Sequence, residues 1–232
     1  MLNLTPIEIE ALKLSLWVGF WAVTGSIGPG ILVAWLLARK NFWGKTLVDG
    51  LIHLPLVMPP VVTGYMLLLV MGKQGVVGHW LFEHTGLCFA FNWKGAALAS
   101  AIMAFPLLVR AIRLSMESVD HRLEQAAQTL GASPLDQFFT VTLPLTLPGI
   151  LTGIILAFAR SLSEFGATIT FVSNIPGETR TLPLALYTLT QMPDGEAGAL
   201  RLCIICATVA LAALVASEMM SRRLNRTLKG DH

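Results

Sequence analysis

The chain has 232 residues, of which 54% are apolar and 13% are charged, and its mean hydropathy is +0.68. Soluble globular proteins carry about 25% charged residues, so this composition excludes an ordinary soluble domain and predicts an all-α integral membrane protein. The formal net charge is only +2, and the basic residues are scattered along the chain, so nothing indicates a nucleic-acid partner.

Five stretches are apolar enough to cross a membrane, which takes about 20 residues of helix. We expect these spans to be surrounded by membrane lipid and to lie near residues 11–38, 47–71, 95–116, 145–172 and 199–221. A polar loop at 117–144 separates the third span from the fourth. No soluble domain is predicted, so residues 1–232 form a single transmembrane domain.

The first two spans contain helix-breaking residues. The run Gly25-Ser-Ile-Gly-Pro-Gly30 predicts an interruption of the first span, and three prolines (Pro55, Pro59 and Pro60) interrupt the second. Proline frees helix carbonyls that lipid cannot pair. The second span is therefore expected to face protein or a water-filled pathway around Pro59 and Pro60, or else to use the kink only for packing.

Two loops are predicted on the side opposite the polar loop. Residues 72–94 contain a short surface helix over 76–84, and residues 173–198 are rich in turn-forming residues. Both loops are candidates for contact with an external partner.

The polar loop contains the sequence EQAAQTLGASPLDQFFTVTLPLTLPG at 124–149. Its first half has one apolar stripe at helical spacing, formed by Leu123, Ala126, Ala127 and Leu130. Gly131 is expected to end this helix, and Ser133-Pro134 to begin a second one. Because alanines add little bulk to the exposed stripe, another protein surface can approach it closely.

The fourth span contains two charged residues, Arg160 and Glu164, at i and i+4. A helix places such residues on one face as a pair, and charges inside a span face protein or water. Ser163 and Thr168 add hydroxyl groups nearby. The pair is therefore either an ion pair that fixes helix register or part of a pathway that tolerates an anion.

The distribution of positive charge predicts the orientation of the chain, because cytoplasmic loops are enriched in Lys and Arg. Ten such residues border one side: Arg39, Lys40, Lys45, Arg110, Arg113, Arg122, Arg222, Arg223, Arg226 and Lys229. Five border the other: Lys13, Lys73, Lys94, Arg180 and Arg201. We therefore expect the N-terminus outside, and the polar loop and the C-terminus in the cytoplasm.

The polar loop resembles the coupling loop of ABC-importer permeases, whose pattern is Glu-Ala-Ala, three residues, Gly, nine residues, Ile-x-Leu-Pro. The spacing is kept by Gln125, Ala126, Ala127, Gly131, Val141, Leu143 and Pro144. Gln125 replaces the Glu of the pattern and Val141 replaces the Ile. Beyond this loop, LPLVMPPVVTGYMLL (54–68) and ARSLSEFGATITFVSNIPGETRTLPLALYTL (159–189) resemble the bacterial molybdate permeases. The SEFGA segment at 163–167 is similar in sulfate permeases too.

The resemblance implies a type I ABC importer permease bundle in the bacterial inner membrane that moves molybdate inward. It implies a second copy of the chain, two cytoplasmic ABC ATPase subunits and a periplasmic or lipid-anchored oxyanion-binding protein. Gly44-Lys45-Thr46 lacks the first glycine of a P-loop, since Arg39 stands at that position. We therefore expect no cofactor on this chain, ATP and Mg²⁺ on the partner ATPase, and no enzymatic activity of the chain itself.

The sequence thus offers two groups of candidate residues, the first from the resemblance of the polar loop and the second from the broken and charged spans. Contact with the ATPase is expected of Arg122, Glu124, Gln125, Ala126, Ala127, Gly131, Ala132 and Pro134. The translocation pathway or its gate is expected at Pro59, Pro60, Arg160, Ser163, Glu164 and Thr168. Sulfate and tungstate remain rival substrates. A secondary transporter or channel, and a membrane enzyme using Arg160 and Glu164, remain other functions.

Overall fold

A computed structural model describes residues 5–229, except the side chains of 217 and 220–229, and every regular element in it is a helix. In chain order these are α1 (Pro6–Arg39), α2 (Lys45–Val57), α3 (Pro60–Met71), α4 (Val76–Thr85), α5 (Trp93–Ser118), α6 (His121–Thr129), α7 (Pro134–Gln137), the π-helical η1 (Phe138–Thr142), α8 (Leu143–Leu162), α9 (Gly166–Val172), α10 (Leu182–Thr190) and α11 (Glu196–Lys229).

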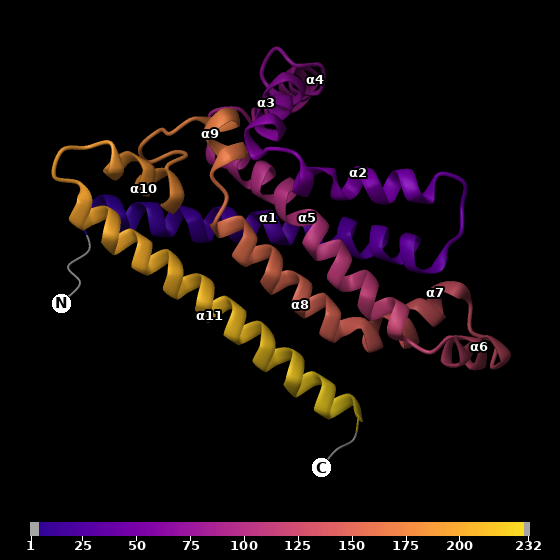
Figure 1. Cartoon of the computed structure of the whole chain (residues 1–232). Coiled ribbons are helices and arrows are strands. Elements are labelled where there is room, and N and C mark those ends of the chain that lie inside the picture. Colours follow the sequence, from indigo (N-terminus) through magenta and orange to yellow (C-terminus); the bar gives the residue numbers. More distant parts are fainter. Residues whose placement is uncertain (1–4, 230–232) are drawn as a thin grey trace.

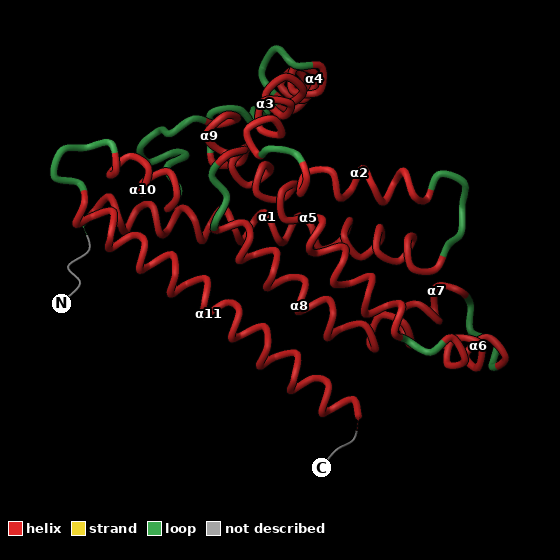
Figure 2. The backbone as a smooth tube through the Cα atoms, viewed as in Figure 1, coloured by secondary structure: helices red, strands yellow, loops and turns green. Residues whose placement is uncertain are grey.

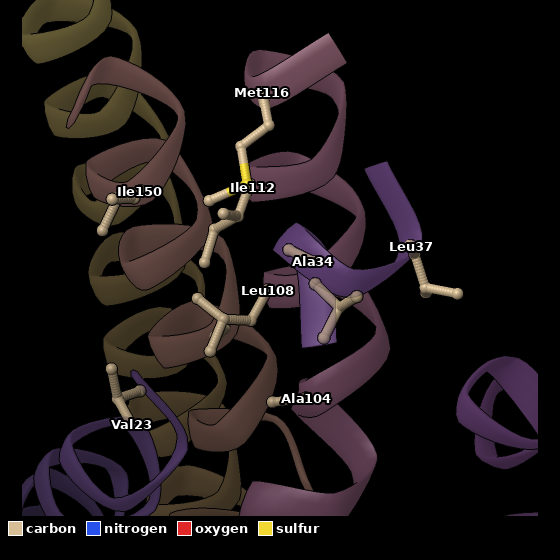
Figure 3. Close-up of a cluster of buried hydrophobic side chains, with 10 residues drawn as sticks. Val23, Ala34, Leu37, Ala104, Leu108, Ile112, Met116 and Ile150 are labelled. Atoms are coloured by element: carbon tan, nitrogen blue, oxygen red, sulfur yellow. The ribbon is translucent and has the colours of Figure 1, made fainter. Parts of the chain in front are cut away.

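Three long helices, α1, α5 and α8, surround the largest apolar core. Leu108 and Ile112 of α5 lie between Ala34 of α1 and Ile150 of α8, and all four side chains are buried (Figure 3). Helix α11 packs along α8 on the outside of this group (Figure 1). Four helices of the described chain are long and apolar enough to cross a membrane, or five spans if α2 and α3 are counted as one broken span.

The predicted interruption of the first span is wrong, because α1 is one continuous helix with Pro29 inside it. Gly30 serves close packing instead: a Cβ placed on it would lie 2.9 Å from Cδ2 of Leu108. The glycine therefore brings α1 against α5 and does not turn the chain.

The predicted interruption of the second span is confirmed, because α2 and α3 meet at a bend of 113°, as in a broken span or a re-entrant loop. Met58 and Pro59 between them have extended backbones, with ψ of 147° and 130°. Each of these residues precedes a proline, and the residue before a proline is displaced from the helical region by steric contact with the proline ring. Two consecutive residues of this kind stop the helix where a single proline would only kink it.

The fourth predicted span, 145–172, is divided as well. Helix α8 ends at Leu162, residues 163–165 are not helical, and the short helix α9 follows. At its other end α8 continues the π-helical turn η1, which the sequence analysis does not predict.

The predicted polar loop lies at one end of the molecule, together with the connection between α1 and α2 (Figures 1 and 2). Helix α10 and the start of α1 lie at the opposite end. The short helix predicted over 76–84 is confirmed as α4. The 173–198 loop contains a helix, α10, that the turn-rich sequence does not predict.

Candidate functional site

The breaks in the two interrupted spans lie against each other. A Cβ placed on Gly166, the first residue of α9, would lie 2.7 Å from Cβ of Pro60, the first residue of α3. One turn further along α3, the same construction at Gly64 overlaps Thr170 and the backbone of Ala167 in α9. The hydroxyl of Thr170 also donates to the carbonyl of Val61 at 3.4 Å. The structure thus brings the proline break, predicted as a pathway candidate, next to the charged segment at 160–164.

Arg160 and Glu164 form the predicted ion pair across the break between α8 and α9. Arg160 Nη2 lies 2.9 Å from Glu164 Oε2. Glu164 Oε1 accepts a hydrogen bond from the backbone N–H of Ala167 at 2.8 Å. Glu164 therefore joins the last turn of α8 to the first turn of α9. The pair is present although Glu164 lies outside the helix on which the prediction was based.

The two partners differ in exposure. The Arg160 side chain is 24% exposed, whereas that of Glu164 is 1% exposed. Ser163 is exposed, and its hydroxyl donates to the carbonyl of Arg160 at 2.9 Å. Thr168 is buried and its hydroxyl donates to the carbonyl of Phe165 at 2.8 Å. An anion approaching this surface therefore meets the guanidinium group, with the carboxylate behind it, and does not meet Thr168.

The helix–turn–helix geometry of the polar loop is confirmed. Helix α6 ends at Thr129, and Gly131 has φ of +91°, a conformation that glycine adopts without steric cost. Ser133 caps α7 by accepting a hydrogen bond from the N–H of Asp136 at 3.2 Å. Pro134 is the first residue of α7, as predicted.

One stripe of the exposed surface of α6 is apolar and uncovered. Leu123 is 49% and Leu130 is 88% exposed, with the exposed Ala126 between them. Ala127 and Ala132 are half-buried, and the remaining predicted contact residues, Arg122, Gln125, Gly131 and Pro134, are exposed.

Glu124 points inward and does not present its charge on the outer surface of α6. It is 6% exposed, and Oε1 lies 2.8 Å from Arg39 Nη2 at the end of α1. The same oxygen accepts a hydrogen bond from the hydroxyl of Thr142 in η1 at 2.7 Å. His121 lies 3.2 Å from the other carboxylate oxygen. Glu124 thus fastens α6 to the end of α1 and to the turn that leads into α8.

Arg39 and Thr142 are functional candidates that the sequence analysis misses. Arg39 counts there only as a border charge that indicates orientation. Both residues lie far from Glu124 along the chain, and helical spacing relates only residues within one helix.

Replacing Glu124 with alanine is expected to destabilise the polar loop. Removing one member of a buried ion pair leaves the other charge uncompensated and costs about 3–5 kcal/mol. Thermal unfolding of the purified protein in detergent should show the loss, and Gln125→Ala, an exposed neighbour, should leave stability within about 0.5 kcal/mol. Equal stability of the two variants would contradict an anchoring role.

The comparisons with known proteins come from sequence and from structure. Residues 30–226 match the family model "Binding-protein-dependent transport system inner membrane component". The molybdenum transport system permease ModB of Escherichia coli K12 is 60% identical over 94% of this chain and 96% of its own length. Its counterpart from Haemophilus influenzae is 58% identical over 95% of this chain and 96% of its own. The sulfate permease CysT of Salmonella typhimurium is 34% identical over 94% of this chain and 78% of its own.

Solved structures of ABC transporters share the fold. A bacterial alginate ABC transporter matches with a TM-score of 0.73 and 21% identity, over 95% of this chain and 80% of that one. The methionine transporter MetNI matches with a TM-score of 0.67 and 14% identity, over 94% of each chain. With its match to the family model over most of its length, the chain belongs to the family of binding-protein-dependent transport system inner membrane components.

Proposed function

We propose that this chain is the membrane-spanning subunit of an ATP-driven importer and that it moves molybdate into the cell. The observation that carries the proposal is 58–60% identity to molybdenum permeases over nearly the whole chain. Sulfate is the alternative substrate, and the lower identity of the sulfate permease makes it the weaker one. Tungstate shares the tetrahedral dianionic shape of molybdate, so it is the second competitor to test.

The polar loop is the proposed contact with a cytoplasmic ATPase. Leu123, Ala126 and Leu130 form an exposed apolar patch bordered by polar residues, which is typical of a protein interaction site, and Ala126 between the leucines leaves room for a partner. Glu124 and Arg39 hold the loop so that movement of the ATPase reaches α1 and α8. On this proposal ATP and Mg²⁺ bind the ATPase, and two copies of this chain pair with two ATPase subunits.

The junction of the broken spans is the proposed gate of the pathway. Pro59 and Pro60 stop one span and residues 163–165 stop the other, and the partly exposed Arg160 lies at the second break. Half-spans that end at one depth are a common way to build a substrate passage. A soluble oxyanion-binding protein outside the membrane is the proposed donor of the anion.

Uptake by the assembled complex tests the function. The chain is purified with its ATPase and reconstituted into vesicles that enclose ATP, and the binding protein and radiolabelled molybdate are added outside. We expect ATP-dependent accumulation that unlabelled molybdate suppresses at lower concentration than sulfate. Suppression by sulfate at the lower concentration would assign the sulfate alternative. Uptake that needs no ATP or ATPase would show a secondary transporter or channel.

The proposed orientation places the N-terminus outside and the C-terminus in the cytoplasm. A cysteine introduced at position 4 should then react with an impermeant thiol reagent added to intact cells, provided that Cys88, Cys203 and Cys206 have been replaced. Position 4 lies outside the described residues, so this prediction rests on the charge distribution alone. Labelling only after the membrane is permeabilised would show that the N-terminus lies in the cytoplasm.

A further inference from the structure

A groove separates α5 from α8 on the surface between Arg160 and the polar loop. Its volume is about 520 Å³, and its lining includes Arg110 and Ser115 of α5 and Gly149, Thr152 and Leu156 of α8. The two helices touch at its base, because a Cβ placed on Gly149 would overlap the side chain of Ser115. The groove is therefore a surface depression whose floor is the close contact between α5 and α8.

Arg110 forms no ion pair of its own. It is exposed, and it has no hydrogen bond or ion pair with any residue whose side chain the structure describes. Arg113, one turn further along α5, is different: it lies 3.1 Å from Asp49 and 2.8 Å from Glu117. Arg110 shares a second cavity of about 320 Å³ with this group and with His53. Because Arg113 already pairs with both carboxylates, the positive charge of Arg110 stays available.

The position of Arg110 makes an unpaired charge unusual. It precedes the end of α5 at Ser118 by eight residues, which is about 12 Å of helix. A charged side chain inside an apolar span is costly in lipid, and it faces protein or water in known membrane proteins. The exposed arginine therefore indicates that the groove faces water or protein and not lipid.

The groove is also aligned with the proposed gate. Thr152, Leu156 and Arg160 follow one another at i+4 intervals on α8, so they form one stripe along that helix. The first two line the groove. The third is the guanidinium group whose charge Glu164 offsets at 2.9 Å. An anion that moves along this stripe passes from Arg160, which is paired with Glu164, to Arg110, which forms no ion pair and lies nearer the polar loop.

We propose that Arg110 and this groove form a transient binding site for the tetrahedral oxyanion on the cytoplasmic side of the gate. The inference rests on the proposed function. A guanidinium group presents paired donors that match two oxygens of such an anion. Thr152 and Ser118 add no donors here, since their hydroxyls already donate to backbone carbonyls. A single cation in an open groove attracts the anion from the gate. Because no other donor holds the anion there, it is released into the cytoplasm.

The first test is uptake by the reconstituted complex. Arg110→Gln should lower ATP-dependent uptake at least tenfold, and Arg110→Lys should lower it less, because the charge remains although the paired donors are lost. Lys45→Gln, which removes a cation outside both cavities, should transport normally. Normal uptake by Arg110→Gln would overturn the proposal. Failure of the unmodified complex to transport molybdate would instead count against the proposed function.

The second test separates an anion site from an arginine that extends toward lipid headgroups. Arg110→Cys and Thr152→Cys are made in a chain whose three native cysteines are replaced by serine. Both positions should react with a negatively charged, water-soluble thiosulfonate from the cytoplasmic side, and millimolar molybdate should slow the reaction at Thr152→Cys, where Arg110 is intact. Lack of reaction at both positions, or a rate at Thr152→Cys that no transported oxyanion alters, would show that the groove holds no anion.

Discussion

Arg160→Ala is expected to reduce oxyanion uptake at least tenfold, which corresponds to about 1.4 kcal/mol or more in the transition state, while the complex still assembles. The guanidinium group is the partly exposed member of its ion pair, whereas Glu164 is buried behind it. Removing Arg160 leaves the negative charge of Glu164 without its partner, so the site repels an anion instead of attracting it. Glu164 keeps its hydrogen bond from Ala167, so the start of α9 retains a cap.

Two further variants separate transport from packing. Glu164→Gln is nearly the same size and can still accept from Ala167, but it leaves Arg160 uncompensated, so we expect tighter anion retention and slower release. Ser163→Ala, which removes an exposed hydroxyl beside the pair, serves as the control for the uptake assay and should change uptake less than Arg160→Ala does. If Arg160→Ala prevents assembly, or if the exchange Arg160→Glu with Glu164→Arg restores full transport, the pair is structural.

Gly131→Val is expected to uncouple ATP hydrolysis from transport. Gly131 has φ of +91°, and no atom lies within 4 Å of a Cβ placed there. The substitution therefore meets no steric contact with other residues, and its cost lies in the backbone conformation, at about 1–2 kcal/mol for an L-residue. Valine is branched at Cβ and is especially unfavourable there. To avoid this strain the turn must change, which displaces α6 relative to α7.

The matched control at this position is Gly131→Asn, because asparagine tolerates the left-handed conformation better than other side chains. Simultaneous measurement of ATP hydrolysis and uptake in vesicles should show a sharp fall in anions transported per ATP for valine and a mild fall for asparagine. Substrate-stimulated hydrolysis and uptake at normal levels in Gly131→Val would contradict the coupling role of this turn.

Local signals in the sequence predict local structure well in this protein. Ser133 and Pro134 mark the start of α7, and the positive φ of Gly131 is where the pattern puts it. Glycine and proline inside long apolar segments are less informative. Gly30 packs against Leu108 in an unbroken helix, whereas Pro59 and Pro60 turn the chain by 113°. The difference depends on what packs against each residue, which the sequence does not reveal.

In the candidate site, too, contacts between neighbours in the sequence are predicted and contacts between distant segments are not. Arg160 and Glu164 are four residues apart, and helical spacing predicts their pairing, although Glu164 lies beyond the end of α8. The inward direction of Glu124 does not follow, because its partner Arg39 comes from another helix. The neighbouring breaks at Pro60 and Gly166 likewise belong to segments far apart in the chain. Contacts of this kind require the tertiary structure.

The close contact between α3 and α9 has a mechanical consequence. With Gly64 pressed against Thr170 and the backbone of Ala167, the two short helices have no room to slide past each other. We expect the extended residues 58–59 and the non-helical residues 163–165 to act as adjacent hinges, about which α3 and α9 move as one rigid unit. We expect α3 and α9 to swing together when the protein changes conformation, so that a single movement displaces both half-spans.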